Sequence, residues 1–285
     1  MKTEAKHNMG EAYYADSASP LNLTGPVSKS LLWKFAASPN KWYYGKTGFT
    51  PTPAMELGTL LHTAILEPEK LDLNYVICPY DSYRTNEARA WKEDTEAQGK
   101  SVVKEAELSS ARFAAETFWA DPLLYHIKEG FAPEVAYYAP LGNVQCKGLV
   151  DIVPDGGNSL VDLKTTASIE SLDNLTKMVY SRGYHWQAAM YLDLYNAVTG
   201  ENRDEFQIVF MESTYPFEIA VVNLSKKYID LGRAGYMNAL MKWQDCIAIE
   251  VFPPAIPCAI EIDPPNWATK QIKKRGRPFK VKASK

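Results

Sequence analysis

The stretch GLVDIVPDGGNSLVDLKT, residues 148–165, constrains this chain more than any other. Gly156-Gly157 separates two apolar runs, a pattern typical of a β-hairpin. A hairpin centred on these glycines places Asp151 directly opposite Asp162. Opposed residues have Cβ atoms roughly 4.5–5.5 Å apart, where like charges destabilise the sheet. The sequence therefore predicts a fold that compensates two facing carboxylates, and a divalent cation is a suitable partner because hard cations bind carboxylate oxygens.

Strand alternation brings further groups to the same place. Lys164 lies two residues after Asp162 and shares its face of the strand. Leu163 points the other way, but its backbone carbonyl lies beside the carboxylates. The stretch thus predicts a site with two acids, a lysine and a backbone oxygen. A surface hairpin with solvated charges and an Asp–Lys ion pair is the other interpretation, since D-x-K alone often matches by chance.

Apolar periodicity predicts helices before this hairpin and strands around it. Helices are expected over 28–37, 54–66, 85–98, 104–119, about 185–198 and 225–248. Strands are expected in the runs EVAYYA, VQCKGLVDIV, SLVDLKT, QIVFME and FEIAVVNL. This order predicts one α/β domain with a mixed sheet. The expected division is a loosely ordered segment over 1–25, the domain over 26–265 and a basic tail over 266–285.

Composition limits the classes of protein to consider. The 285 residues are 46% hydrophobic and 23% charged, which excludes disorder, collagen and coiled coil for most of the chain. No run approaches the roughly 18 apolar residues of a membrane helix. The polar N-terminus lacks the apolar core of a signal peptide, so the expected location is the cytoplasm, with no membrane partner. The cysteines show no CxxC spacing, which disfavours a zinc site. They are Cys78, Cys146, Cys246 and Cys258.

Charge is distributed unevenly along the chain. The last sixteen residues, 270–285, hold eight basic side chains and no acidic one, whereas the other 269 residues have a net charge of −11. Such a tail suits a polyanion such as nucleic acid, or serves as a solubilising end. Its RGRP sequence at 275–278 matches the core of an AT-hook, which inserts arginines into a narrow minor groove; a plain polybasic tail is the other interpretation. The predicted DNA-binding residues are Lys273, Lys274, Arg275 and Arg277.

Several blocks together resemble a known nuclease superfamily. Asp151, then Asp162-Leu163-Lys164, then a helix with Gln187 is similar to the PD-(D/E)xK pattern. More narrowly, the chain resembles the phage-type exodeoxyribonuclease VIII (RecE-like) group. GTLLHTAILEP at 58–68 resembles the histidine motif of that group. YSRGYHWQAAMYLDLY at 180–195 and SKSLLWKFAASPNKWYY at 28–44 resemble two more of its blocks, so the resemblance covers about residues 28–224.

The resemblance implies a fold and an activity. The fold is a PD-(D/E)xK, restriction-endonuclease-like core with a mixed central β-sheet flanked by helices. The activity is a Mg²⁺-dependent 5′-to-3′ exonuclease on double-stranded DNA ends, with Mn²⁺ able to substitute, that leaves 3′ single-stranded overhangs. The resemblance also implies a homo-oligomeric ring that cooperates with a RecT-type single-strand annealing protein in phage recombination inside a bacterial host cell.

The resemblance also implies roles for individual residues. His62, Asp151, Asp162 and the Leu163 carbonyl are expected to bind metal, with Asp151 bridging two ions. Lys164 is expected to hold the attacking water and a phosphate oxygen. An imidazole ligand is unusual for Mg²⁺ and fits Mn²⁺ better. The expected catalytic set is Lys164, Asp151, Asp162 and Gln187, with Glu134 and Tyr191 as accessory residues.

Other interpretations of these residues stay open on the sequence alone. His62 lies on a helix with Leu61 and Ile65, a pattern that by itself favours a buried structural histidine, and only the resemblance of its block favours a metal ligand. Gln187 and Tyr191 are neighbours on one helix face and either orient Lys164 or a phosphate, or only pack. Glu134 begins a strand and either joins the acid cluster or is an edge residue.

Two other kinds of protein compete with this hypothesis. A RecB-type or CRISPR-associated nuclease with an iron–sulfur cluster needs three close cysteines after the core, whereas only Cys246 and Cys258 stand there. A non-catalytic DNA-binding or scaffold protein would use the acid cluster structurally, and it predicts no metal-dependent cleavage.

Overall fold

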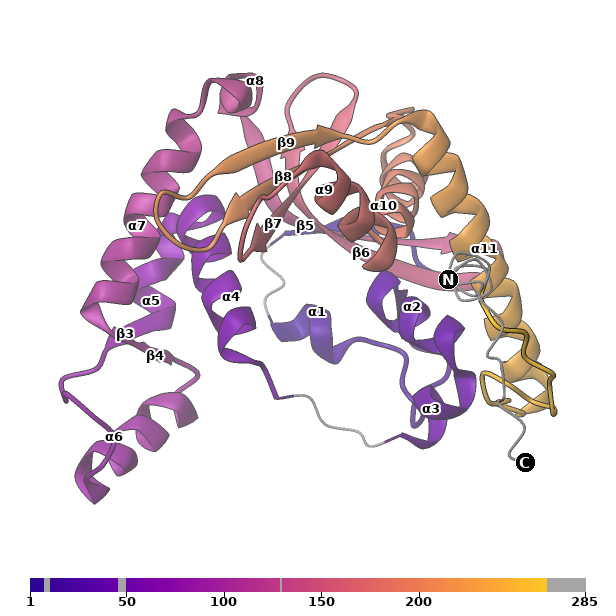
Figure 1. Ribbon diagram of the computed structural model, residues 1–285, viewed down its shortest axis with the longest axis horizontal. Coiled ribbons are helices and arrows are strands. Elements are labelled where there is room, and N and C mark those ends of the chain that lie inside the picture. The colour runs from indigo at the N-terminus through magenta and orange to yellow at the C-terminus, as the bar shows by residue number, and fades with distance from the viewer. Residues whose placement is uncertain (8–10, 46–49, 129, 266–285) are drawn as a thin grey trace, which may run out of the picture.

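A mixed seven-stranded sheet forms the centre of the computed structural model, which describes residues 1–7, 11–45, 50–128 and 130–265 (Figure 1). The tail residues Lys273, Lys274, Arg275 and Arg277 lie outside the described residues. The strand order is β1-β5-β6-β7-β8-β9, and β2 pairs with β6. The strands are β1 (Glu4–Lys6), β2 (Val27–Ser28), β5 (Phe131–Leu141), β6 (Val144–Pro154), β7 (Ser159–Thr166), β8 (Glu205–Glu212) and β9 (Ile219–Asn223).

The predicted hairpin forms in the predicted register. Ile152 on β6 pairs with Val161 on β7 in antiparallel fashion, which is the pairing that a hairpin centred on Gly156-Gly157 gives. β7 then pairs in parallel with β8, while β5–β6 and β8–β9 are antiparallel. The mixed sheet of the predicted fold class is therefore confirmed, and it carries the two aspartates on adjacent central strands.

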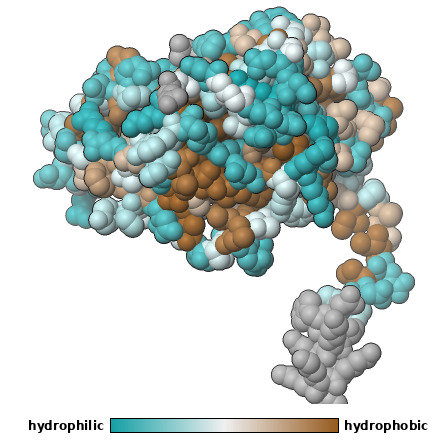
Figure 2. Space-filling model, turned by 90° about the horizontal axis from the view of Figure 1, so that it is seen from above, coloured by the Kyte–Doolittle hydropathy of each residue, from teal (hydrophilic) through white to brown (hydrophobic). Residues whose placement is uncertain are grey.

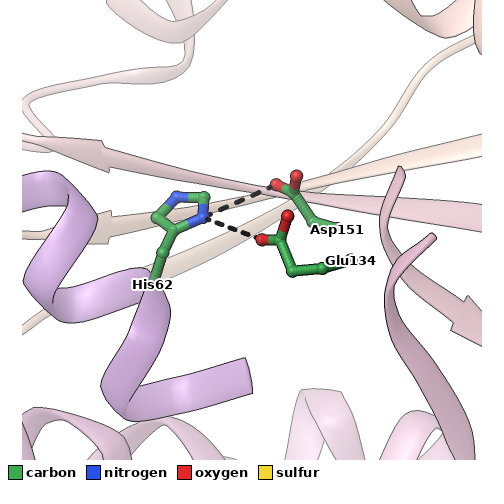
Figure 3. Close-up of side chains that lie close together, drawn as sticks. All are labelled: His62, Glu134 and Asp151. Carbon is green, nitrogen blue, oxygen red and sulfur yellow. Dashed lines mark ion pairs between the residues drawn. The ribbon is translucent and has the colours of Figure 1, made fainter. Parts of the chain in front are cut away.

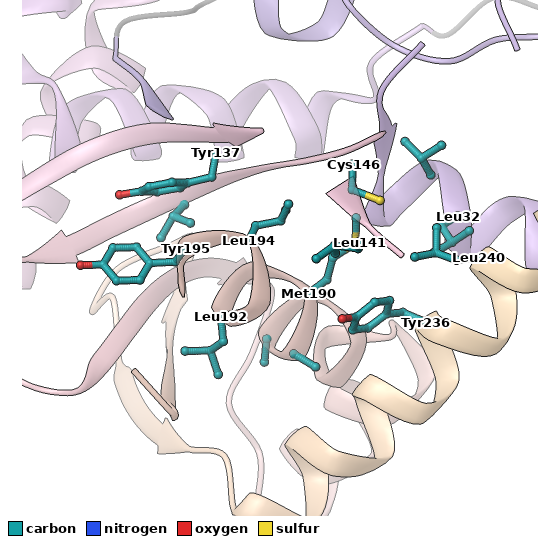
Figure 4. Packing of buried hydrophobic residues seen from close by; sticks show 14 of the residues in the cluster. Leu32, Tyr137, Leu141, Cys146, Met190, Leu192, Leu194, Tyr195, Tyr236 and Leu240 are labelled. Carbon is teal, nitrogen blue, oxygen red and sulfur yellow. The ribbon is translucent and has the colours of Figure 1, made fainter. Parts of the chain in front are cut away.

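Helices cover both faces of the sheet, with a hydrophobic core on each side (Figure 1). One core lies between the sheet and the helices α2 (Lys29–Ala37), α10 (Tyr184–Thr199) and α11 (Lys226–Ile249). Figure 4 shows this core, where Tyr195 of α10 lies beside Tyr137 of β5. The other core packs α4 (Pro53–Leu66) and α7 (Glu105–Ala120) on the opposite face. In the described part of the chain, no helix combines the length and apolar character needed to span a bilayer.

The predicted helices form within one or two residues of their expected ends. Ser28 caps α2 by accepting the Leu31 N–H, as its sequence position indicates. The chain also contains short elements that apolar periodicity did not predict. Besides β1 and β2, they are α1 (Glu11–Ala15), α3 (Pro39–Tyr44), α5 (Leu71–Asn74), β3 (Tyr75–Ile77), β4 (Ser101–Val103) and α8 (Tyr125–Lys128). The longer helix α9 (Leu172–Ser181) was not predicted either. Helix α6 (Asn86–Ala97) is the one expected over 85–98.

The segment over 1–25, expected to be loosely ordered, contributes to the sheet. β1 pairs with β5, so Glu4 lies opposite Tyr138. Lys147 on β6 is fully buried and donates hydrogen bonds to the carbonyls of Tyr13 and Asp16, which ties α1 to the sheet. These hydrogen bonds join segments that are far apart in the sequence, so local sequence patterns do not predict them.

Gly232 sets how closely α11 approaches α10. A Cβ atom built on Gly232 would lie 1.9 Å from the carbonyl oxygen of His185, which belongs to the backbone of α10. Backbone atoms cannot move aside as the end of a flexible side chain can. The two helices therefore pack at a distance that only glycine permits at this position.

We expect Gly232→Ala to lower the free energy of unfolding by about 1–3 kcal/mol, because the added methyl group overpacks the helix crossing. The sign is informative, since replacing glycine by alanine inside an unobstructed helix stabilises it by about 1 kcal/mol. Asn238→Ala, at an exposed position of the same helix, is the control and should leave the stability unchanged or slightly raised. Urea unfolding of both variants measures this, and a stabilised Gly232→Ala protein would contradict the close packing.

Candidate metal centre

Three metal-binding side chains from three elements converge at one point on the sheet. His62 comes from α4, Glu134 from β5 and Asp151 from β6, as Figure 3 shows. His62 Nδ1 lies 3.9 Å from Glu134 Oε1 and 3.9 Å from Asp151 Oδ2. One ligand atom from each residue lies within 4.8 Å of the others. The structure thus joins the sequence-predicted His62 and Asp151, and it places Glu134 with them rather than leaving it as an isolated edge residue.

A glycine on α4 allows the histidine to come so near the strands. A Cβ atom on Gly58, one turn before His62, would lie 3.0 Å from Thr165 Oγ1 on β7. Contacts this short are rare, so a larger residue here would require the Thr165 side chain or the helix to shift by a few tenths of an ångström. α4 therefore crosses the sheet closely enough for the imidazole to face the carboxylates.

The backbone of Glu134 is held in an uncommon conformation. Its φ angle is +49°, in the left-handed region that few residues other than glycine adopt. The flanking pairs Pro133–Ile152 and Val135–Val150 keep the β5–β6 register, so Glu134 lies level with Asp151 while departing from regular strand geometry. Such a conformation costs about 1–3 kcal/mol and is most common at functional sites.

Asp162 takes part in a second set of contacts beside this cluster. It is almost completely buried, forms an ion pair with Lys164, and accepts a hydrogen bond of 2.5 Å from Gln187 Nε2. Asp151 in turn accepts the backbone N–H of Leu163 at 2.8 Å. The structure therefore brings Lys164 and Gln187 to Asp162. Among the described residues, the cluster of three possible metal ligands consists of His62, Glu134 and Asp151 and does not include Asp162.

The pKa values of Asp151 and Asp162 are raised, because both carboxyl groups are buried and lie close to other acids. Burial, followed by the charge of Asp151, raises the pKa of Asp162 to about 6. Burial also raises the pKa of Asp151 above its usual value, and Glu134 adds to this effect. For His62, burial alone would lower the pKa, but Glu134 and Asp151 outweigh burial and raise it. A bound cation would relieve this charge, since an opposite charge favours ionised carboxylates.

Two lysines lie at the site, of which Lys29 is buried and Lys164 is half-buried. Burial would lower the pKa of Lys164, but Asp162 and Asp151 outweigh burial and raise it, so the amine is protonated. Its Nζ lies 3.5 Å from the carbonyl of Leu163 and 5.3 Å from the ring centre of Tyr184. Lys29 Nζ lies 5.5 Å from the same ring and donates to a backbone carbonyl at 2.8 Å. Two ammonium groups therefore flank one aromatic ring.

The sequence predicted part of this arrangement. Gln187 was expected to orient Lys164 or a phosphate, and it instead holds Asp162. The ring of Tyr191 packs so closely on Gly148 that a Cβ atom there would lie 2.7 Å from it, which is a packing contact. Lys29 and Tyr184 were missed, although each lies inside a block that carries the family resemblance. Their approach depends on α2 meeting the start of α10, which spacing along the chain does not show.

The chemistry of the cluster fits a divalent cation. Ligand oxygens about 2.0–2.2 Å from an ion such as Mg²⁺ or Mn²⁺ lie roughly 3–4.5 Å from one another. The observed spread of up to 4.8 Å among ligand atoms of His62, Glu134 and Asp151 closes to this range with small side-chain movements. Two carboxylates provide the hard oxygen ligands that such ions prefer, and the imidazole favours Mn²⁺ over Mg²⁺.

Comparison with known proteins agrees with the observed fold. Residues 28–259 match a family model described as a PDDEXK-like domain of unknown function (DUF3799). No curated protein matches the sequence significantly. A crystal structure from Eubacterium rectale, whose description proposes an exonuclease, is 17% identical, covers 93% of this chain and 98% of its own, and superposes with a TM-score of 0.63. At this identity the likeness shows a shared fold.

A second crystal structure is more distant. It is described as a phage related exonuclease from Haemophilus somnus, is 17% identical, and covers 79% of this chain and 96% of its own. Its TM-score of 0.36 is too low to support an inference about this chain.

We expect His62→Ala to weaken Mn²⁺ binding by about tenfold, a loss of about 1.4 kcal/mol, because one of three converging ligands is removed. His126→Ala, at an exposed position on α8, is the matched control and should bind Mn²⁺ as the parent does. Isothermal titration with Mn²⁺ in the absence of DNA measures both affinities. Equal affinities for the parent and His62→Ala would exclude His62 from the metal site.

Proposed function

Because the chain belongs to a family of PDDEXK-like domains, we propose that it is a metal-dependent exodeoxyribonuclease whose centre is the cluster described above. The observation that carries this proposal is the convergence of His62, Glu134 and Asp151 within 4.8 Å, beside the Asp162-Leu163-Lys164 strand. The left-handed backbone of Glu134, two buried aspartates and a half-buried lysine meet at this one place. Two neighbouring carboxylates repel each other, and a cation bound between them and the histidine would remove this repulsion.

Each residue has a proposed task. His62, Glu134 and Asp151 hold the metal, and Asp162 and the Leu163 carbonyl complete its ligands. Mg²⁺ or Mn²⁺ bound there, in a two-metal arrangement, supplies charge neutralisation and an activated water for phosphodiester hydrolysis. Gln187 fixes the orientation of Asp162 by its hydrogen bond. Tyr191 supports the centre by packing.

The protonated amine of Lys164 acts as a hydrogen-bond donor in this proposal. Its raised pKa makes it a poor general base and a good partner for a phosphate oxygen or the attacking water. Lys29 lies beside the same Tyr184 ring and is suited to a neighbouring phosphate of the same strand. Both ammonium groups thus serve to position the DNA backbone.

The finer features of the proposal rest on the resemblance to the RecE-like group. They are digestion of double-stranded DNA ends from 5′ to 3′, a homo-oligomeric ring, and cooperation with a RecT-type annealing protein during recombination. The basic tail, with Lys273, Lys274, Arg275 and Arg277, would attract DNA to a domain that is itself acidic. The active-site acids would then be neutralised by metal rather than repel the substrate.

We expect linear duplex DNA with Mg²⁺ or Mn²⁺ to lose nucleotides from its 5′ ends. Asp162→Asn should slow this release by about 100-fold or more, because the substitution removes the negative charge of a proposed metal ligand. Asp173→Asn, at an exposed position of α9, is the control and should digest DNA at the parental rate. Duplexes labelled at the 5′ or the 3′ end, with metal omitted in parallel, provide the measurement.

Each outcome decides a separate part of the proposal. Absence of metal-dependent release from either end would favour the non-catalytic scaffold. Release from the 3′ label alone would keep the nuclease and overturn its polarity. An Asp162→Asn protein that digests DNA as fast as the parent would show that the centre is assigned wrongly.

A further inference from the structure

The two edges of the central sheet differ in how they are protected. The β1 edge is three residues long and carries an ion pair between Glu4 and Lys6. The β9 edge, Ile219–Asn223, is apolar from Ile219 to Val222, and these four side chains are half-buried. Short length and charge are devices that prevent an edge from pairing with another chain, and an apolar edge without them readily accepts a strand. β9 therefore offers a site for strand addition.

Backbone N–H groups point outward along this edge. Leu224 donates its N–H to the carbonyl of Phe206 on β8 at 2.9 Å. Because residues two apart in a strand point their N–H groups the same way, the N–H groups of Val222 and Ala220 also face β8. Those of Val221 and Ile219 then face outward, ready to bond a further strand.

A segment with the pattern of a strand follows α11 and makes no strand of its own. In residues 256–262 the sequence IPCAIEI places Ile256, Cys258, Ile260 and Ile262 at alternate positions, all exposed. Their exposed fractions reach 60% for Ile256, 57% for Ile260 and 85% for Ile262. Figure 2 shows brown, apolar side chains on the stretch that stands away from the body and leads into the grey residues. Isoleucines so exposed lose the stabilisation that burial would give them.

This segment cannot reach the β9 edge of its own chain. α11 begins next to the end of β9 and is 24 residues long, about 36 Å at 1.5 Å per residue. It runs away from β9 toward the C-terminal end (Figure 1). The six steps from Glu250 to Ile256 span at most about 22 Å. Ile256, where the segment begins, therefore stays short of β9, so the segment cannot pair along β9 of its own chain and strand addition has to join two molecules.

We propose that residues 256–262 of one copy of this chain add as an outer strand to β9 of a second copy. Seven extended residues cover about 23 Å, enough for the five residues of β9. Main-chain hydrogen bonds would use the outward N–H groups, and the alternating isoleucines would cover the apolar side chains beside them. The contact is head-to-tail, so successive copies either close a ring or extend as a chain. It does not depend on the proposed nuclease chemistry.

Sedimentation of the full chain at micromolar concentrations tests the role of the segment. The full chain should assemble, and Ile260→Glu should weaken assembly at least tenfold by placing a charge in the contact. Glu261→Gln, on the opposite side of the same segment, and a chain that ends at Pro265, which lacks only the basic tail, should both assemble like the parent. A monomeric full chain, or an Ile260→Glu protein that assembles like the parent, would overturn the proposal.

Crosslinking through the native Cys258 tests the place of contact. Glu218→Cys and Asn223→Cys put a thiol at either end of β9, and a short bis-maleimide should join Cys258 to at least one of them across two chains. Glu93→Cys on the distant α6 is the matched control and should give no such product, and adding Cys258→Ser to the β9 variants should abolish it. Failure at both β9 positions, or equal crosslinking at Glu93→Cys, would overturn the assignment to this edge.

Discussion

The register of the β6–β7 hairpin decides the character of the whole centre. Pairing of Ile152 with Val161 puts Asp151 and Asp162 level with each other on adjacent strands. A shift of β7 by one residue would send Asp162 to the other face of the sheet, into the packed core, and away from Asp151. Apolar residues on the same strands, such as Leu163, fill that core and fix the register. Hydrophobic packing on one face thus holds two acids in place on the other.

The protein compensates these acids only in part. Asp162 has Lys164 and Gln187, and Asp151 has the N–H of Leu163. The carboxylates of Glu134 and Asp151 both face His62, and burial raises the pKa of both aspartates. A site that is stable enough to fold and still anionic is what binding of a divalent cation requires.

Local signals in the sequence were sufficient for the main elements and for the hairpin, because glycine pairs, caps and apolar periodicity act over a few residues. They also pointed to Asp151 and Lys164, whereas His62 was indicated only by the resemblance of its block, GTLLHTAILEP, to the family's histidine motif. They left Glu134 undecided, since its role depends on a backbone conformation and on the β5–β6 register. They missed Lys29, whose position beside Tyr184 depends on two helices far apart in sequence. The place of Gln187 beside Asp162 likewise depends on how α10 lies across the sheet.

The account as a whole depends on a cation between residues that three separate elements bring together. The most direct test is a crystal grown with Mn²⁺, with diffraction data collected at a wavelength where manganese scatters anomalously. We predict an anomalous peak within about 2.3 Å of oxygens from Glu134 and Asp151, with a nitrogen of His62 turned toward it. A well-ordered centre without such a peak, or with manganese bound elsewhere, would contradict the account.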